Sequence, residues 1–175
     1  MKILPLISLE QIQLRIRELV LVFLRSEKDT SYIFITTLIG AKKFADFFLA
    51  ELKQYPNISF QNYEIKLSSY GADTKSSGKI SLEKDLLVNL ENHKVFILED
   101  IVDTGLTLSF FKNYLLTTKK VSEVKIITLL NKLARRKIDI QIDYQGFEVP
   151  DKFIVGFGID YNQEYRELDY IGYLE

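Results

Sequence analysis

Three carboxylates follow a short apolar run in the middle of the chain. Residues 95–98 (Val-Phe-Ile-Leu) form that run, and Glu99, Asp100 and Asp103 come directly after it. A run of this kind is typical of a strand that is covered on both faces of a parallel sheet. Open α/β sheets bind their ligands just beyond the carboxyl ends of the strands. The sequence therefore predicts that these acids contribute to a ligand site.

Thr104 to Thr107 form a turn that is predicted to open a helix. Free backbone N–H groups and the helix dipole at such a position favour a phosphate group. Gly105 lets the backbone approach the ligand closely, and the two Thr hydroxyls add donors. Glu99 and Asp100 are suited to accept hydrogen bonds from a ribose diol or to hold magnesium through water. The pattern predicts a sugar phosphate, and it contains no Gly-Lys-Ser/Thr of a triphosphate-binding loop.

Two other roles are open for these acids on the residues alone. A single Asp before a helix commonly serves as its N-cap, and Asp103 taken alone fits that role. The string Asp103-Thr104-Gly105 is also the motif of aspartic proteases, in which two such aspartates share a proton. That motif requires a β-rich chain with a second copy or a dimer, whereas here it begins a predicted helix. The protease is therefore the weakest interpretation.

The elements that must position these residues alternate between strand and helix. Residues 95–98 and 124–130 are predicted strands with a predicted helix at 106–116 between them, which forms a right-handed crossover unit. Residues 68–81 offer little to bury, so we predict a mobile, functional loop there. We expect 1–175 to form one α/β domain. The other predicted elements are a helix from Ser8 to about Arg25, strands at 32–37 and 58–67, a helix at 42–52, a helix or turn at 82–90, and short pieces at 138–144, 152–156 and 158–161.

Composition excludes several classes of protein and site. The 175 residues carry a formal net charge of −1, which argues against a general nucleic-acid binder. The chain has no Cys, which excludes disulfides, and His93 is its only His, so a zinc site is not expected. A metal here would be a hard cation held by oxygens. The longest apolar stretch, 19–24, is too short to cross a bilayer and no segment reads as a secretion signal, so we expect a cytoplasmic protein without a membrane partner.

Several further motifs extend the pattern around the acids. With them, the sequence resembles the type I phosphoribosyltransferases and, more narrowly, the hypoxanthine (hypoxanthine-guanine) phosphoribosyltransferase family. The resemblance covers the chain from about Ser31 to its last residue. Its motifs are Ser-Ser-Tyr-Gly at 68–71, Glu-Asp-Ile-Val-Asp-Thr-Gly-Leu-Thr at 99–107, Leu-Leu-Asn-Lys at 129–132, Gly-Phe-Glu-Val-Pro-Asp-Lys-Phe-Ile-Val-Gly at 146–156 and Gly-Ile-Asp-Tyr-Asn at 158–162.

The resemblance implies a fold, a reaction and a cofactor. The fold would be a mainly parallel central sheet flanked by helices, with a small hood built from C-terminal segments at about 138–175. The reaction would join hypoxanthine or guanine, both 6-oxopurines, to the ribose of phosphoribosyl pyrophosphate, releasing pyrophosphate. Mg²⁺ would be the cofactor, and the subunits would form homodimers or homotetramers.

The resemblance also implies a role for each residue of the predicted site. Asp103 would be the catalytic base or acid beside N7 of the purine. Lys132 would face the purine O6, because a lysine has only donors and therefore suits a 6-oxo group and not a 6-amino group. The other implied roles are ribose and magnesium binding by Glu99 and Asp100, 5′-phosphate binding by Asp103, Thr104, Gly105, Leu106 and Thr107, stacking of the base on Phe153 with a backbone carbonyl from Ile154, pyrophosphate binding by Ile39, Gly40, Ser69, Tyr70 and Arg166, and a second magnesium on Asp160.

Two positions depart from the pattern of that family. A basic residue commonly precedes the first glycine of its pyrophosphate loop, where this chain has Ile39, which leaves backbone N–H groups and Lys42 or Lys43 to bind the pyrophosphate. Leu106 stands where a lysine or asparagine is often found. Ile39 keeps open a non-catalytic regulator that senses the sugar phosphate, and an enzyme that prefers xanthine is the nearer alternative. The basic cluster at 135–137 is predicted to be surface charge, with a phosphate or a neighbouring subunit as its other candidate contact.

Overall fold

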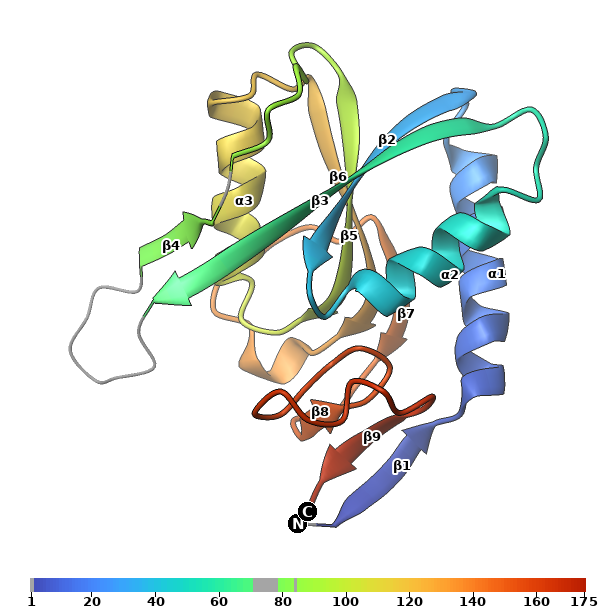
Figure 1. Cartoon of the computed structure of the whole chain (residues 1–175), viewed down its shortest axis with the longest axis vertical. Coiled ribbons are helices and arrows are strands. Elements are labelled where there is room, and N and C mark those ends of the chain that lie inside the picture. The colour runs from blue at the N-terminus through green and yellow to red at the C-terminus, as the bar shows by residue number, and fades with distance from the viewer. Residues whose placement is uncertain (1, 71–78, 84) are drawn as a thin grey trace.

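A six-stranded sheet forms the centre of the molecule in the computed structural model, which describes residues 2–70, 79–83 and 85–175. The strand order is β4-β3-β2-β5-β6-β7, and all neighbours are parallel except the β3–β4 pair (Figure 1). The predicted α/β fold with a mainly parallel sheet is confirmed. The bounds are β2 (Ser31–Leu38), β3 (Ser59–Tyr70), β4 (Lys79–Leu82), β5 (Lys94–Val102), β6 (Glu123–Asn131) and β7 (Tyr144–Glu148).

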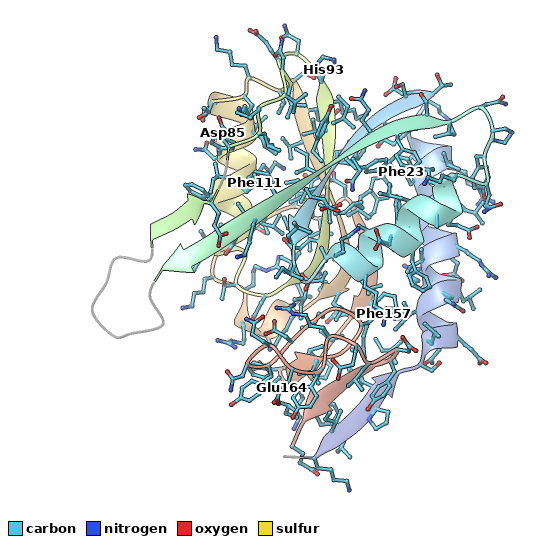
Figure 2. The ribbon with its side chains drawn as sticks, viewed as in Figure 1. Phe23, Asp85, His93, Phe111, Phe157 and Glu164 are labelled. Atoms are coloured by element: carbon cyan, nitrogen blue, oxygen red, sulfur yellow. The ribbon has the colours of Figure 1, made fainter. Side chains whose placement is uncertain are left out.

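Helices cover both faces of this sheet. On one face lie α1 (Leu9–Ser26) and α2 (Lys42–Leu52), and on the other lies α3 (Leu106–Thr117) (Figure 1). A capping box of Ser8 and Gln11 fixes the start of α1. The two faces have separate hydrophobic cores, one around Phe23 of α1 and one around Phe111 of α3 (Figure 2). A short 3-10 helix, η1 (Leu133–Arg135), follows β6.

A second, smaller sheet is antiparallel and contains both ends of the chain. Its order is β1 (Ile3–Ile7), β9 (Ile171–Leu174) and β8 (Phe153–Val155). The hood was expected from C-terminal segments alone, but this sheet also takes a strand from the N-terminus, which the sequence analysis did not identify. β1 is short, and Pro5 interrupts its alternation of side chains, so its pattern is weak. Among the helices of the described residues, none is long and apolar enough to span a membrane.

Three other expectations about the elements need correction. Glu99 and Asp100 lie within β5 and not after it, because the ladder to β6 continues as far as Val102. The ends of the predicted loop at 68–81 are strands, since β3 runs to Tyr70 and pairs with β4, and antiparallel pairing needs backbone groups more than apolar side chains. Residues 71–78 of that prediction lie outside the described residues. Leu82 is the last residue of β4, and the described residues after it, 83 and 85–90, form neither a helix nor a turn, so both options at 82–90 are wrong for the described part.

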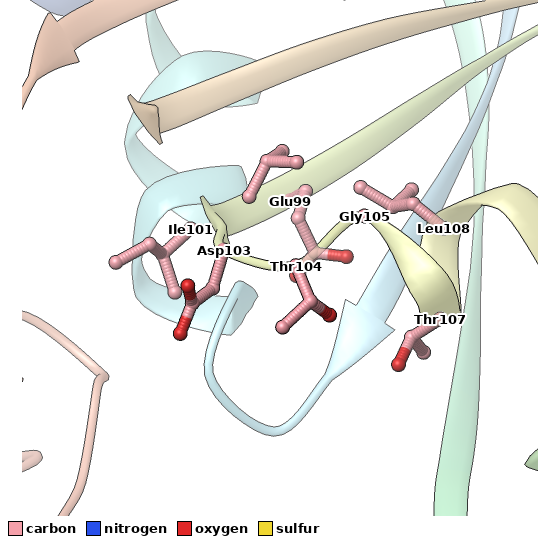
Figure 3. Close-up of a pocket in the computed structure, with 8 residues that line it drawn as sticks. Glu99, Ile101, Asp103, Thr104, Gly105, Thr107 and Leu108 are labelled. Atoms are coloured by element: carbon pink, nitrogen blue, oxygen red, sulfur yellow. The ribbon is translucent and has the colours of Figure 1, made fainter. Parts of the chain in front are cut away.

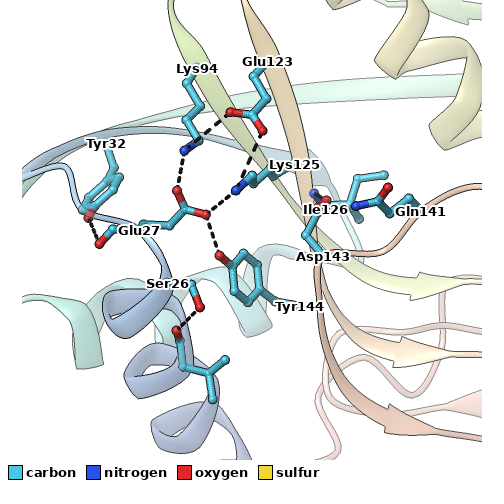
Figure 4. Close-up of polar contacts among 11 residues, drawn as sticks. Ser26, Glu27, Tyr32, Lys94, Glu123, Lys125, Ile126, Gln141, Asp143 and Tyr144 are labelled. Carbon is cyan, nitrogen blue, oxygen red and sulfur yellow. Dashed lines mark hydrogen bonds and ion pairs between the residues drawn. The ribbon is translucent and has the colours of Figure 1, made fainter.

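A buried carboxylate connects the end of α1 to the sheet. It lies at the start of β5, at the opposite end of that strand from Glu99 and Asp100. Glu27 is only 3% exposed, and it accepts hydrogen bonds from Lys94, from Lys125 at 2.7 Å and from the hydroxyl of Tyr144 at 2.5 Å (Figure 4). Burial alone would raise the pKa of Glu27. The hydrogen bonds from the two lysines and the tyrosine outweigh burial and lower its pKa from 4.5 to about 2.

We expect Glu27→Gln to lower the free energy of unfolding by about 3 kcal/mol near pH 7, because two partly buried lysines lose their counter-charge. The folded pKa is depressed, so this stabilisation is complete above pH 4.5 and is lost as the pH falls towards about 2. The difference between parent and variant in urea unfolding should therefore shrink across that range. Glu123→Gln is the control, because Glu123 contacts the same two lysines but is half exposed, and it should cost less than about 1 kcal/mol. Equal losses in the two variants would contradict the central role of Glu27.

Candidate active site

Two adjoining cavities lie where β2 and β5 end. The first, of about 200 Å³, surrounds the turn between β5 and α3, and the second, of about 290 Å³, lies between β5 and the loop after β2. Glu99 and Thr107 line both cavities, so a single ligand can occupy the two together. The first is lined by Glu99, Ile101, Val102, Asp103, Thr104, Gly105, Thr107 and Leu108, and the second by Thr37, Leu38, Ile39, Gly40, Leu67, Glu99, Asp100, Thr107, Asp160 and Arg166.

The turn at the first cavity presents backbone amides and hydroxyls to the ligand. Gly105 occupies the N-cap position of α3 with a φ of +81°, a conformation that side chains with a Cβ rarely adopt. The side chains of Asp103, Thr104 and Thr107 project from this turn and from the first turn of α3 on the same side (Figure 3). Because the N-cap is Gly105, the interpretation of Asp103 as the helix cap is wrong. The amides at the start of α3 suit an anion such as phosphate.

Asp103 has one carboxylate oxygen facing cations and one without a partner. Its Oδ2 lies 3.5 Å from the guanidinium of Arg135 and 4.0 Å from Nζ of Lys132. Its Oδ1 is buried and accepts no hydrogen bond from the described part of the chain. An unsatisfied buried acceptor is costly, and a bound donor removes that cost. Oδ1 of Asp103 is therefore available to accept a hydrogen bond from a donor of the ligand.

Glu99 and Asp100 place two carboxyl groups side by side on β5. Burial and the charge of Asp100 raise the pKa of Glu99 well above its usual range. Oδ1 of Asp100 accepts a hydrogen bond of 2.9 Å from the amide of Ile101, and Oδ2 lies against Gly40 so closely that a methyl group there would overlap it. The pair therefore presents carboxyl oxygens to the second cavity, and a bound cation or the donors of a diol would stabilise the charged form of Glu99.

The opposite wall of the second cavity comes from the segment between β8 and β9. Arg166 pairs with Asp160 at 2.7 Å and donates to the carbonyl of Gly158 at 2.7 Å. Ile39 and Gly40 line the same cavity from the loop after β2. The residues expected at one pyrophosphate and metal position thus come together from separate parts of the chain. Ser69 and Tyr70 lie at the end of β3, and their side chains are outside the described residues.

A third group of predicted residues lies beyond Asp103 and lines neither cavity. Lys132 is only 4% exposed, and its Nζ donates to the carbonyl of Lys152 at 2.8 Å. The ring of Phe153 is half exposed and meets the ring of Tyr161 edge to face, with centroids 5.0 Å apart. Ile154 is buried in β8. The 4.0 Å approach of Lys132 to Asp103 joins this group to the first cavity.

Oxygen ligands for a divalent cation are present, but only as a partial set. Glu99 and Asp100 stand on one side of the second cavity and Asp160 on the other. Within the described residues, no group of three or more His, Cys, Asp or Glu is close enough to hold a metal alone. Mg²⁺ is commonly bound by one or two carboxylates together with waters and substrate phosphates. The residues therefore fit a magnesium ion that is shared with a phosphorylated ligand.

A contact that the sequence did not reveal holds the backbone of the turn at 103–107 from below. Arg136 donates to the backbone carbonyls of Asp103 and Val102, at 3.0 and 3.3 Å, and to Oδ1 of Asn131 at 2.5 Å. The amide of Lys137 donates to the carbonyl of Thr104 at 2.9 Å. The run of basic residues at 135–137 was the only signal in the sequence. It was predicted to be surface charge, which is wrong for Arg136 because its guanidinium is held against backbone carbonyls.

The two lysines at the start of α2 do not line the second cavity. Lys42 pairs with Asp46 at 2.7 Å and with Glu64 at 3.1 Å. Lys43 contacts the segment before β9, where it pairs with Asp169 at 2.7 Å. The expectation that one of them supplies charge to a pyrophosphate is not met by this geometry, because both ammonium groups are already paired elsewhere. Leu106 also lines neither cavity, and its side chain is partly exposed on α3.

Comparison with known proteins places this site in a family. Residues 8–162 match the model of the phosphoribosyl transferase domain. The chain is 42% identical to the hypoxanthine-guanine phosphoribosyltransferase of Bacillus subtilis over 97% of this chain and 92% of the relative. It is 39% identical to the bifunctional protein TilS/HprT of Listeria monocytogenes over 97% of this chain, which spans only 26% of that relative. A crystal structure of a hypoxanthine-guanine phosphoribosyltransferase from Bacillus anthracis superposes with a TM-score of 0.90 and 38% identity, covering 99% of this chain and all of that one.

We expect Gly105→Ala to weaken the binding of ribose 5-phosphate by about tenfold, as the loss of one charge-assisted hydrogen bond would. The new Cβ would lie 2.9 Å from the carbonyl of Ile138 at a positive φ, so the turn must shift. Calorimetric titration measures the affinity. Gly146→Ala is the matched control, because Gly146 lies on β7, away from both cavities, and its Cβ would overlap the carbonyl of Leu129 on β6. It should reduce stability but leave the affinity unchanged, and equal affinities in all three proteins would refute the phosphate role of this turn.

Proposed function

The chain belongs to the phosphoribosyl transferase family, and on this premise we propose that it is a hypoxanthine-guanine phosphoribosyltransferase of purine salvage. It transfers the phosphoribosyl group from phosphoribosyl pyrophosphate to hypoxanthine or guanine, giving the nucleoside monophosphate and pyrophosphate. The observation that carries the proposal is the pair of cavities that share Glu99 and Thr107. Their residues match the three parts of this substrate in order, with amides for the 5′-phosphate, carboxylates for the ribose and an arginine for the pyrophosphate.

The 5′-phosphate and the ribose occupy neighbouring positions in this proposal. The amides and hydroxyls from Asp103 to Thr107 bind the phosphate, and Glu99 and Asp100 accept hydrogen bonds from the ribose hydroxyls. Both acids line the second cavity, and Glu99 also faces the first. The sugar therefore spans the shared wall. The bond from C1′ to the base is on the side of Asp103, and the bond from C1′ to the pyrophosphate is on the side of Arg166. Arg166, Gly40 and Ile39 contact the pyrophosphate, and Ser69 and Tyr70 are assigned to it on the family resemblance alone.

The purine lies beyond Asp103, against Lys132 and Phe153. The ammonium group of Lys132 donates to O6, replacing its present bond to the carbonyl of Lys152. The exposed ring of Phe153 stacks on the base. The backbone carbonyl of Ile154 accepts from N1–H or from the 2-amino group of guanine. A base with a 6-amino group would leave the buried Lys132 facing a donor, so adenine is rejected.

Catalysis in this arrangement comes from positioning and electrostatics. N9 of the base forms a bond to C1′ while the bond from C1′ to the pyrophosphate oxygen breaks, and the electron pair leaves with the pyrophosphate. Asp103 accepts the proton that the purine loses at N7 through Oδ1, which has no hydrogen-bond partner among the described residues. The carboxylates of Glu99 and Asp100 stabilise the positive charge that develops on the sugar.

Mg²⁺ is the cofactor in this proposal. Glu99 and Asp100 would hold one ion, and Asp160 would hold a second near the pyrophosphate. When bound, Mg²⁺ would neutralise charge on the pyrophosphate leaving group. The carboxyl oxygens that Glu99 and Asp100 present to the second cavity support a cation at this position. The proposal also includes a homodimer or homotetramer and a cytoplasmic location, both on the strength of the family resemblance.

We expect a spectrophotometric assay with Mg²⁺ and phosphoribosyl pyrophosphate to give turnover with hypoxanthine, guanine or both, and little with adenine. Each base is supplied in turn, with xanthine as the fourth. The physical reason is that Lys132 offers only donors to position 6 of the base. Turnover with adenine at the rate of the best substrate would contradict the role of Lys132. Turnover with none of the four would contradict the proposed function.

We expect Asp103→Asn to lower kcat by about 100-fold or more, because an amide cannot accept the proton from N7. The affinity for phosphoribosyl pyrophosphate should stay within about threefold of the parent, since the backbone amides of the turn remain. Steady-state kinetics and calorimetric titration measure the two quantities. Asp46→Asn, which changes a surface acid on α2, is the control and should match the parent. A parental kcat in Asp103→Asn would rule out proton transfer through this residue.

A further inference from the structure

The second wall of the pyrophosphate cavity belongs to a segment with little regular structure of its own. Residues 156–170 connect β8 to β9 and carry Asp160 and Arg166. Within this segment the described pairing consists of two isolated bridges, Gly156 with Ile159 and Tyr161 with Glu164. Such a segment takes its position from contacts with the rest of the molecule. The positions of Asp160 and Arg166 in the site therefore depend on the contacts that hold this segment.

Lys43 of α2 makes the polar contact that holds the returning end of this segment. Its Nζ lies 3.2 Å from the carbonyl of Leu168, 3.4 Å from the carbonyl of Glu167 and 2.7 Å from Oδ1 of Asp169. An ammonium group has three donors, so these acceptors account for all of them. The side chain is 25% exposed, and its Nζ also lies 5.2 Å from the centre of the Phe157 ring. Lys43 thus contacts the segment both before and after the residues of the site.

The outgoing end of the segment docks on the same part of the core. Phe157 is completely buried, and its ring packs against Phe47 of α2 with centroids 5.2 Å apart (Figure 2). Gly158 lies so close to Gly40 that a Cβ on Gly158 would overlap the carbonyl of Gly40. Close packing of this kind fixes the distance between the segment and α2, but it does little to fix the orientation of the segment. The hydrogen bonds of Lys43 fix that orientation.

Next to Lys43, two backbone hydrogen bonds join the two ends of the segment, residues 157–158 and 166–168, which we call its neck. The amide of Phe157 donates to the carbonyl of Leu168 at 2.9 Å, and the amide of Gly158 donates to the carbonyl of Arg166 at 3.0 Å. The carbonyl of Leu168 therefore accepts from both Phe157 and Lys43. Asp160 and Arg166 lie in the loop that this neck closes. A change at Lys43 acts directly on the neck.

We propose that Lys43 is a positioning residue that fixes the loop of Asp160 and Arg166 over the pyrophosphate and magnesium subsite. This inference rests on the proposed function for the identity of the ligand. Lys43 does not line the cavity, and its three donors are occupied, so it acts through the loop and not by touching the pyrophosphate. Lys42, the preceding residue, pairs only with Asp46 and Glu64 among the described residues and has no contact with the loop.

The test compares Lys43→Met with Lys42→Met. Both substitutions keep an unbranched side chain and remove one charge at the start of the same helix. Lys43→Met should raise the KM for phosphoribosyl pyrophosphate and the Kd for pyrophosphate with Mg²⁺ by about tenfold, since the loop no longer holds its groups in place. The KM for the base should change by less than about threefold, because Lys132 and β8 lie outside the loop and only the ring of Phe153 contacts it, through Tyr161. Lys42→Met should match the parent in every quantity.

Hydrogen exchange supplies a readout that does not depend on catalysis. The amides of Phe157 and Gly158 should exchange about tenfold faster in Lys43→Met than in the parent, and Lys43→Arg should restore part of the protection. Parental exchange together with a parental KM in Lys43→Met would overturn the proposal. If Lys43→Met does not fold, Asp169→Asn replaces it, because it removes one acceptor of the contact, and it should raise the same exchange rates. A parent enzyme without turnover would contradict the proposed function, while the exchange rates would still decide the role of Lys43.

Discussion

The placement of two neighbouring carboxyl groups, Glu99 and Asp100, in one cavity is the constraint on which the site depends. Both carboxylates lie on β5, and within the described residues neither forms an ion pair with a cationic side chain. Glu27 is the opposite case, because two lysines and a tyrosine satisfy its buried carboxylate. The chain thus contains one acid that is neutralised by the fold and a pair that is left for a ligand. The first holds α1 to the sheet, and the second defines where a ligand with donors or a cation binds.

The arrangement of the parallel strands explains why the pair lies where it does. β5 lies between β2 and β6, so its end is flanked by Ile39 and Gly40 after β2 and by Lys132 after β6. Parallel strands end at one edge of a sheet, which brings loops from distant parts of the sequence together. The hood supplies the remaining groups, Phe153, Asp160 and Arg166. One part of the site therefore lies on the rigid sheet. The other part lies on a segment whose position depends on its contacts with the rest of the molecule.

The local patterns predicted the parts of the fold that rest on side-chain periodicity. The helix at 42–52 was predicted with the bounds that the structure gives, and the buried strands at 95–98 and 124–130 lie inside β5 and β6. β1 was missed because a short strand around Pro5 has no clear alternation, and its partner β9 is more than 160 residues away in the sequence. The roles of Arg136 and Lys43 were missed for a related reason. Both side chains bind backbone carbonyls, and a carbonyl leaves no signal in the residue types.

The order β1-β9-β8 places the last strand of the chain in the middle of the small sheet, with the first strand at one side. β1 and β9, the first and last strands, consequently lie side by side, as Figure 1 shows. A covalent link between these two strands would span a short distance, as is usual for folds that accept circular permutation. In the same sheet β9 pairs with both β1 and β8, so β1 supports the strand that carries Phe153 through one intervening strand. β1 therefore helps to hold the surface that we assign to the base.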